Sequence, residues 1–151
     1  MTAEVARPIV SERVFSASPA ALFEAFRDPV RLARWWGPRG FTNTFHEFDL
    51  RAGGAWRFTM HAPDGRTFDN HKQFVDIVPA DRIVFQHIAA THRFRMTMTF
   101  APEAGGASTR LTWRMDFETA AAADEFRDFI TEANEQNLDR LEAELVRRPP
   151  D

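Results

Sequence analysis

Residues 119–147 have the periodicity of a single amphipathic helix. At about 100° per residue, the large apolar side chains gather on one side of this helix and the acidic side chains on the other. The apolar side carries Phe126, Phe129, Ile130, Ala133, Leu138, Leu141 and Leu145. Such a helix is about 40 Å long, so its apolar side needs one large concave partner. We expect the rest of the chain to form a sheet that curves around it.

The clearest alternation of apolar and polar residues lies in residues 91–101 and 109–117. In both segments Phe, Met, Trp or Leu alternates with Arg, Thr or Asp, as in an antiparallel sheet with one buried and one solvated face. Short connections between the strands predict a meander. Further strands are predicted at residues 9–17, 42–49, 55–62, 67–78 and 82–88, which makes about seven in all.

Cap and breaker residues place two short helices between the first two strands. Ser18 and Asp28 each precede a proline, the pattern of a polar N-cap followed by proline at the first helical position. The Gly and Pro of residues 35–41 then end the second helix in a loop. The predicted fold is therefore α+β, with a curved antiparallel sheet, two short helices and a long C-terminal helix.

Composition narrows the classes of function. The formal charge of −3 gives no reason to expect nucleic acid or an anionic membrane as a partner. The chain has no cysteine, which excludes disulfides and thiolate metal sites. Without a signal peptide or a long apolar run, we expect one cytoplasmic domain over residues 1–151. Lys72 is the only lysine among nineteen basic residues, either because arginine makes forked contacts to carboxylates or because of the source genome's composition.

The order of elements resembles the helix-grip plan of START-like (birch-pollen-allergen-like) proteins. More specifically, several motifs between residues 9 and 146 resemble the bacterial branch of the Hsp90-ATPase-activator-like family. These motifs are Asp28-Pro29, Trp35-Trp36-Gly37-Pro38, Gly40-Phe41, Gly53-Gly54, Asp64-Gly65 and Pro79. The resemblance implies a ligand cavity between the sheet and the long helix. It implies no catalytic residue and no cofactor, and it is compatible with a homodimer.

Bulky side chains on the inner face are expected to line this cavity, because a curved sheet and one helix do not close completely. Ligand pockets are mostly apolar, and Met and Phe make such a lining adaptable. Any one of these residues can instead simply fill the core. The predicted ligand-binding residues of this kind are Trp56, Phe58, Phe85, Phe94, Met96, Met98, Trp113, Met115, Phe129 and Ile130.

The loop after the second short helix is predicted to lie at the cavity mouth. Trp35, Trp36 and Phe41 either plug this end of the cavity or form an exposed surface for a partner. We expect the plug, with at least one tryptophan buried. Arg39 in the same loop is either solvated or placed to meet an anionic ligand.

Polar residues on the inner faces are candidates for orienting a ligand. Asn134 and Asn137 interrupt the apolar side of the long helix, and a buried amide must be hydrogen-bonded to backbone, water or ligand. If Asp64-Gly65 forms a two-residue turn, residue 71 pairs with residue 58 and His71 faces inward. His87 and His92 also alternate with inward residues, so each is either a core histidine or an acid or base near neutral pH. Their spacing does not predict a metal site.

Three functions remain open. The favoured one is non-catalytic binding of an unknown small apolar ligand. The second is an Hsp90-type co-chaperone or protein-interaction module, which requires an exposed patch on the outer sheet face. That patch would contain Arg93, Arg95, Arg110 and Arg114. The third is an enzyme acting on an apolar cyclic or polyketide-like substrate through His71 or Asn137.

Overall fold

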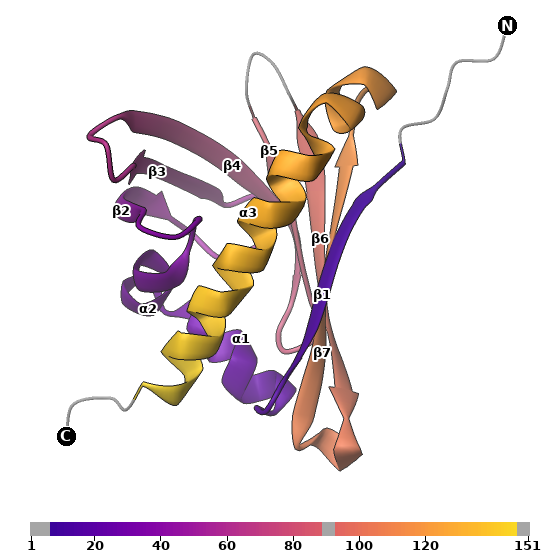
Figure 1. Ribbon diagram of the computed structural model, residues 1–151. Helices are drawn as coiled ribbons and strands as arrows, with labels where there is room; N and C mark the ends of the chain where they lie inside the picture. The colour runs from indigo at the N-terminus through magenta and orange to yellow at the C-terminus, as the bar shows by residue number, and fades with distance from the viewer. Residues whose placement is uncertain (1–6, 89–92, 148–151) are drawn as a thin grey trace, which may run out of the picture.

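One antiparallel sheet forms most of the molecule, and a long helix crosses its inner face (Figure 1). The computed structural model describes residues 7–88 and 93–147. Its strands are β1 Ile9–Phe15, β2 Thr42–Phe48, β3 Ala55–His61, β4 Thr67–Val78, β5 Arg82–His87, β6 Phe94–Glu103 and β7 Ser108–Phe117. Its helices are α1 Pro19–Arg27, α2 Pro29–Trp35, the 3-10 turn η1 Ala104–Gly106, and α3 Ala120–Val146. The seven strands lie in the order β1-β7-β6-β5-β4-β3-β2, which confirms the predicted fold class.

The two short helices begin where the cap signals predict. The side chain of Ser18 accepts a hydrogen bond from the backbone N–H of Ala21 at 3.2 Å, at the start of α1. Asp28 does the same for Val30 at 2.9 Å, at the start of α2. Each side chain satisfies one of the N–H groups that a helix start leaves without a partner. Local sequence is sufficient to define these two helices.

The β3–β4 hairpin has a different register from the predicted one. Its loop contains three residues, since the N–H of Ala62 bonds to the carbonyl of Arg66 at 2.8 Å and Gly65 lies in the left-handed region with φ 92°. Arg57 therefore pairs with His71. A shift of one residue moves every side chain of a strand to the other face. The predicted inward placement of His71 is wrong: its side chain is exposed on the outer face.

The long helix is rotated relative to its predicted apolar side. Leu138 and Leu141 are buried as expected, but Phe129 is 71% exposed and its predicted inward placement is wrong. Glu135 and Asp139, from the acidic side, bind Arg13 of β1 at 2.9 and 2.8 Å. The acidic side of α3 thus lies against the edge strand β1, while Phe129 faces outward.

Candidate functional site

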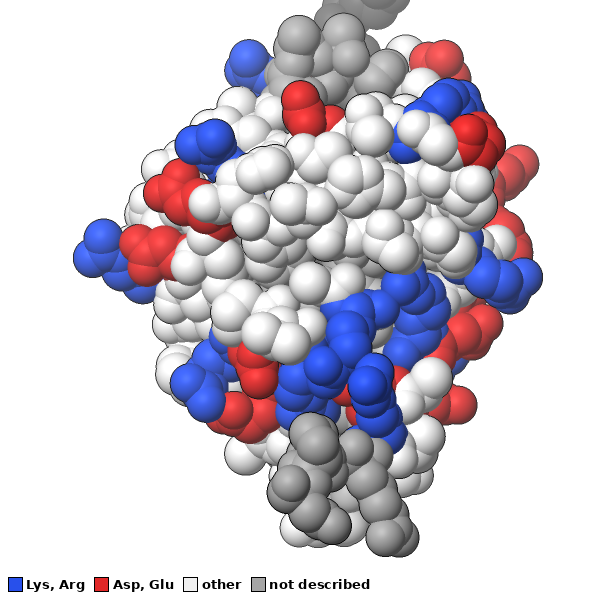
Figure 2. Space-filling model, turned by 90° about the vertical axis from the view of Figure 1, so that its left-hand side faces the viewer, with Lys and Arg blue, Asp and Glu red and all other residues white. Residues whose placement is uncertain are grey.

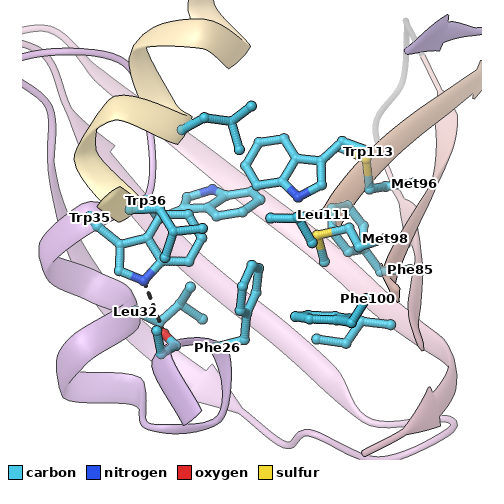
Figure 3. Packing of buried hydrophobic residues seen from close by; sticks show 14 of the residues in the cluster. Phe26, Leu32, Trp35, Trp36, Phe85, Met96, Met98, Phe100, Leu111 and Trp113 are labelled. Atoms are coloured by element: carbon cyan, nitrogen blue, oxygen red, sulfur yellow. Dashed lines mark hydrogen bonds between the residues drawn. The ribbon is translucent and has the colours of Figure 1, made fainter. Parts of the chain in front are cut away.

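The end of the interior nearest α1 and α2 is filled by tryptophan side chains (Figure 3). Trp35 and Trp36 are both buried, which confirms that at least one tryptophan of this loop lies in the core. Trp35 donates its indole N–H to the carbonyl of Ala25 at 2.9 Å. The ring of Trp36 lies 4.9 Å from Trp56 and 5.5 Å from Trp113, measured between centroids. This part of the loop is a plug.

Arg140 of α3 holds the plug in place. Its guanidinium donates hydrogen bonds to four backbone carbonyls at the end of α2, at 2.7 to 3.2 Å. Those carbonyls belong to Arg34, Trp36, Gly37 and Pro38. Beneath the plug, apolar side chains enclose a void of only about 10 Å³. The predicted internal cavity is therefore absent from this part of the described interior.

A second part of the interior contains a buried amine. Lys72 of β4 points inward, is only 4% exposed, and places its Nζ 3.1 Å from Nδ1 of His87. Four predicted ligand-binding residues surround this Nζ with their rings. The centroids lie at 4.9 Å for Phe85, 5.6 Å for Phe94, 5.7 Å for Phe58 and 5.9 Å for Trp56. Aromatic faces attract a cation at such distances.

Burial changes the protonation of this pair. Loss of solvation lowers the pKa of Lys72 from 10.5 to about 7. Loss of solvation, followed by the positive charge of Lys72, lowers the pKa of His87 from 6.5 to about 3. In the described part of the chain no carboxylate binds Nζ, so nothing restores the cost of burying its charge. A partly neutral amine beside a neutral imidazole is an unusual arrangement, of the kind found at reactive sites.

Sequence reasoning missed Lys72 because of the hairpin register. A two-residue turn, which places His71 on the inner face, would place the next residue, Lys72, on the outer face. With the observed three-residue loop, Lys72 shares the inner face with Phe74. Its being the only lysine was the one signal that could have drawn attention to it.

An open depression borders this buried pair at His87. Its volume is about 690 Å³, and it is lined by His46, Arg57, Phe58, Asp69, Asn70, His71, His87 and Ile88. Two of these residues also lie next to Lys72 Nζ: the ring of Phe58 faces it, and Nδ1 of His87 is hydrogen-bonded to it. The ring of His87 stacks on Phe94 with centroids 4.9 Å apart. His87 thus connects the depression to the amine.

The two predicted asparagines behave differently. Both are buried. Asn134 donates to the hydroxyl of Ser11 at 3.2 Å and contacts the sulfur of Met115 at 3.5 Å. Asn137 Oδ1 has no hydrogen-bond partner among the described residues. Asn134 is accounted for by the fold, whereas Asn137 still needs a donor from water or a ligand.

A groove of about 540 Å³ opens between α3, the loop after α2 and the tip of the β3–β4 hairpin. Its walls are Pro38, Arg39, Phe41, Pro63, Arg66, Phe68, Phe129, Glu132, Ala133 and Gln136. Phe41, predicted at a cavity mouth, lies here with its ring 6.3 Å from that of Phe68. Phe129 contributes its exposed ring to the groove from α3.

The remaining predicted residues have simpler positions. Met96, Met98, Trp113 and Met115 are buried, and Ile130 is partly buried against the core. His92 lies outside the described residues. Within residues 7–88 and 93–147, no three His, Cys, Asp or Glu side chains are arranged to hold a metal ion. None of the helices in the same ranges has the length and apolarity that a bilayer crossing requires.

The charges on the surface are largely compensated where the outer sheet face was expected to be basic. Arg110 pairs with Glu12 at 2.9 Å and with Glu103 at 2.6 Å, and Arg114 pairs with Asp116 at 3.0 Å. Basic side chains instead gather where α2 meets the C-terminal end of α3, below a broad uncharged surface (Figure 2). The arginines of these segments are Arg31, Arg34, Arg140 and Arg147.

A seven-stranded antiparallel sheet with a long C-terminal helix across it, and two short helices between β1 and β2, defines a START-like protein of the helix-grip type. Comparison with family models gives a narrower assignment. The model described as "Activator of Hsp90 ATPase homolog 1-like protein" matches residues 16–146. The chain belongs to this family.

Solved structures of bacterial proteins share the fold. Protein CV1439 from Chromobacterium violaceum is 29% identical, with a TM-score of 0.77 over 91% of this chain and 96% of that one. A protein from Arthrobacter aurescens is 22% identical, with a TM-score of 0.84 over 94% and 90%. An AHSA1 protein from Silicibacter pomeroyi is 23% identical, with a TM-score of 0.76 over 93% and 98%. Comparison with curated proteins found no match.

Proposed function

We propose that the protein binds a small apolar molecule with an acidic group, in the groove between α3, the loop after α2 and the β3–β4 hairpin. The observation that carries this proposal is the position of Phe129. Its side chain is exposed, yet it belongs to a groove that also contains Phe41 and Phe68. A volume of about 540 Å³ falls within the range of small-molecule sites, roughly 300–1,000 Å³.

Among the described residues, the groove wall contains both a free cation and a carboxylate, and the carboxylate of Glu132 already accepts a hydrogen bond from Gln136 at 3.2 Å. Arg39 forms no ion pair with any described residue, and its backbone N–H is held by the side chain of Gln136 at 3.1 Å. Arg66, across the groove, is already paired with Asp64 at 2.7 Å. Arg39 is therefore the cation available to a carboxylate or sulfonate, which the planar guanidinium binds with two hydrogen bonds.

Asn137 supports binding at the same side of α3. It follows Gln136 of the groove wall in the helix and lies one turn beyond Ala133, between the groove and the buried side. Its unpartnered oxygen is costly to bury, at about 1–3 kcal/mol, unless a ligand or water donates to it.

Two fluorescent probes that differ by one charged group test the proposal. N-phenyl-1-naphthylamine is neutral, and 8-anilinonaphthalene-1-sulfonate is the same skeleton with a sulfonate. We expect Phe129→Ala to weaken both probes about tenfold, because it removes roughly 1.4 kcal/mol of apolar contact. Val146→Ala is the matched control, since Val146 is an exposed apolar residue of the same helix away from the groove. Equal titration curves for the two variants would rule out the groove.

The charge of the ligand is tested separately. Arg39→Gln should weaken the sulfonate probe by up to about fivefold, the effect of one exposed ion pair, and leave the neutral probe unchanged. Arg51→Gln is the control, because Arg51 is an exposed arginine outside the groove. An Arg39 variant that weakens both probes equally would contradict the acidic group and leave apolar binding in place.

A further inference from the structure

The buried amine of Lys72 lies apart from the proposed groove. None of the groove-lining residues touches Nζ, which is enclosed by Trp56, Phe58, Phe85 and Phe94 and bonded to His87. A lysine used only for packing is readily replaced by methionine or leucine without burying an amine. Retaining an amine here costs stability, so its chemistry requires an explanation.

The contacts of Nζ have the features of a nucleophilic amine site. The surrounding rings exclude water and provide apolar contact for the body of a ligand. His87 Nδ1 at 3.1 Å can accept a proton from the amine. Phe58 and His87 line the depression of about 690 Å³ and also border Nζ, so the depression and the amine share two residues. Lysines that react with carbonyl groups are commonly desolvated in apolar pockets.

We propose that Lys72 forms a reversible imine with a small apolar aldehyde or ketone that enters through the depression beside His87. This adds a covalent carbonyl-binding site to the protein, and it does not depend on the ligand proposed for the groove.

The chemistry balances with the residues present. The lone pair of the neutral amine attacks the carbonyl carbon, a C–N bond forms, and the C=O π pair moves to oxygen. The nitrogen loses one proton to His87 Nδ1, which passes it to the oxygen to give a neutral carbinolamine. The nitrogen lone pair then expels the hydroxyl as the C=N bond forms, and the remaining N–H proton passes through His87 Nδ1 to that hydroxyl, which leaves as water. One carbonyl compound and one amine yield one imine and one water, with no oxidant or reductant.

The lowered pKa of Lys72 supplies the reactive form at neutral pH. About half of the Lys72 amine is neutral at pH 7, compared with about one in 3,000 for an ordinary lysine. The less basic amine is also a weaker nucleophile, which offsets part of this advantage. We expect a net gain in rate of at least about tenfold over an exposed lysine.

Reductive trapping with propanal and cyanoborohydride tests the proposal on the intact protein. Because Lys72 is the only lysine, the variant Arg51→Lys adds one exposed reference amine to the same chain. Peptide mass spectrometry then measures both adducts in one tube. At pH 7 the adduct on Lys72 should form at least about tenfold faster than the one on the reference amine. Modification of the reference amine with Lys72 unmodified would overturn the proposal.

The pH dependence of this ratio requires no variant of the site itself. Above pH 7 the reference amine gains reactive form about tenfold per pH unit, while Lys72 is already mostly neutral. The ratio of the two rates should therefore fall steadily between pH 7 and about 10. A ratio that does not change with pH would show that Lys72 titrates like an exposed lysine, and would contradict the proposal.

His87 is tested by a pair of identical substitutions. His87→Phe retains a ring against Phe94 but removes Nδ1. It should slow trapping of Lys72 by roughly tenfold, less than the effect of a well-matched base, because burial lowers the pKa of His87 to about 3. His71→Phe is the control, because His71 lines the same depression from the outer face without contacting Nζ. Equal trapping in the two variants would remove His87 from the mechanism. Phe129→Ala should leave trapping of Lys72 unchanged. The proposal for the groove and the proposal for Lys72 can therefore be contradicted independently of each other.

Discussion

The two ends of the helix–sheet interface differ in how their buried charged groups are paired. At the end nearest α1 and α2, Trp35 and Arg140 bond to backbone carbonyls, and Glu144 bonds to Arg34 at 2.7 Å. At the other end, Asn137 keeps an unpartnered oxygen, Phe129 is exposed, and a lysine is buried without a carboxylate. We call these the closed end and the open end.

This contrast separates stability from binding along one helix. Satisfied polar groups and packed aromatic rings lower the free energy of the folded state, so the closed end holds the sheet and helix together. Unpartnered polar groups and exposed rings raise it, and they are retained where a ligand can compensate for them. Substitutions at the open end should therefore change the stability of the fold less than substitutions at the closed end.

The largest expected effect is at the plug of the closed end. Trp36→Ala should lower the free energy of unfolding by about 4 kcal/mol, because it removes a buried indole from contact with three neighbouring tryptophans. Phe129→Ala at the open end should change it by less than about 0.5 kcal/mol. Urea denaturation measures both. If both variants lowered the free energy of unfolding by a similar amount, the closed and the open end would not differ in their contribution to stability.

The next effect concerns Lys72 and the pH dependence of stability. Its folded pKa of about 7 lies below the unfolded value of 10.5, so between these pH values only the unfolded chain holds the proton. Stability should therefore rise with pH across this window, by at most about 5 kcal/mol, because the cost of burying the charge is full below pH 7 and disappears gradually as the pH rises to 10.5.

The composition of the chain makes this measurement specific. There is no tyrosine and no cysteine, so above about pH 8.5 Lys72 is the side chain that titrates. Lys72→Met should raise stability at pH 7 and below, and should flatten the alkaline rise. Urea denaturation from pH 6 to 10.5 tests both statements. If the stability of the wild type changed with pH as little as that of the variant, the pKa of Lys72 would be the same in the folded and unfolded states, which would contradict the prediction.

A smaller effect is expected for a buried carboxylate of the closed end. Glu144 is buried, with Arg34 and Arg31 at 2.7 and 3.7 Å. Because Arg34 is partly exposed, Glu144→Gln should cost only about 1–2 kcal/mol. Glu135→Gln, which removes the more exposed partner of Arg13, should cost less than about 0.5 kcal/mol. Thermal unfolding of both variants gives the comparison, and a reversed order would contradict it.

The smallest effect distinguishes the two asparagines. Asn134→Ala breaks a bond to Ser11 and should cost about 1 kcal/mol. Asn137→Leu removes an unsatisfied amide and should be neutral or slightly stabilising without ligand. A loss of stability for Asn137→Leu equal to that for Asn134→Ala would show that Asn137 already has a partner in the free protein.

Elements that depend on neighbouring residues were predicted well. The caps at Ser18 and Asp28, the strand from Thr67 to Val78, and the long helix follow from side chains within a few positions of one another. Capping, alternation and helical periodicity act over a few residues, so sequence alone is enough to place these elements. Their order then determined the fold, because few arrangements can bury so long an amphipathic helix.

Features that depend on contacts between distant residues required the folded molecule. The hairpin loop, in which Gly65 is left-handed, contains three residues and not the predicted two. Because of this difference of one residue, Lys72 and not His71 lies on the inner face. Arg13 of β1 lies more than a hundred residues before its partner Asp139 on α3, and Phe129 of the same helix is exposed. The order of the elements follows from local patterns, whereas the faces of β4 and α3, and with them the candidate sites, follow from long-range pairing.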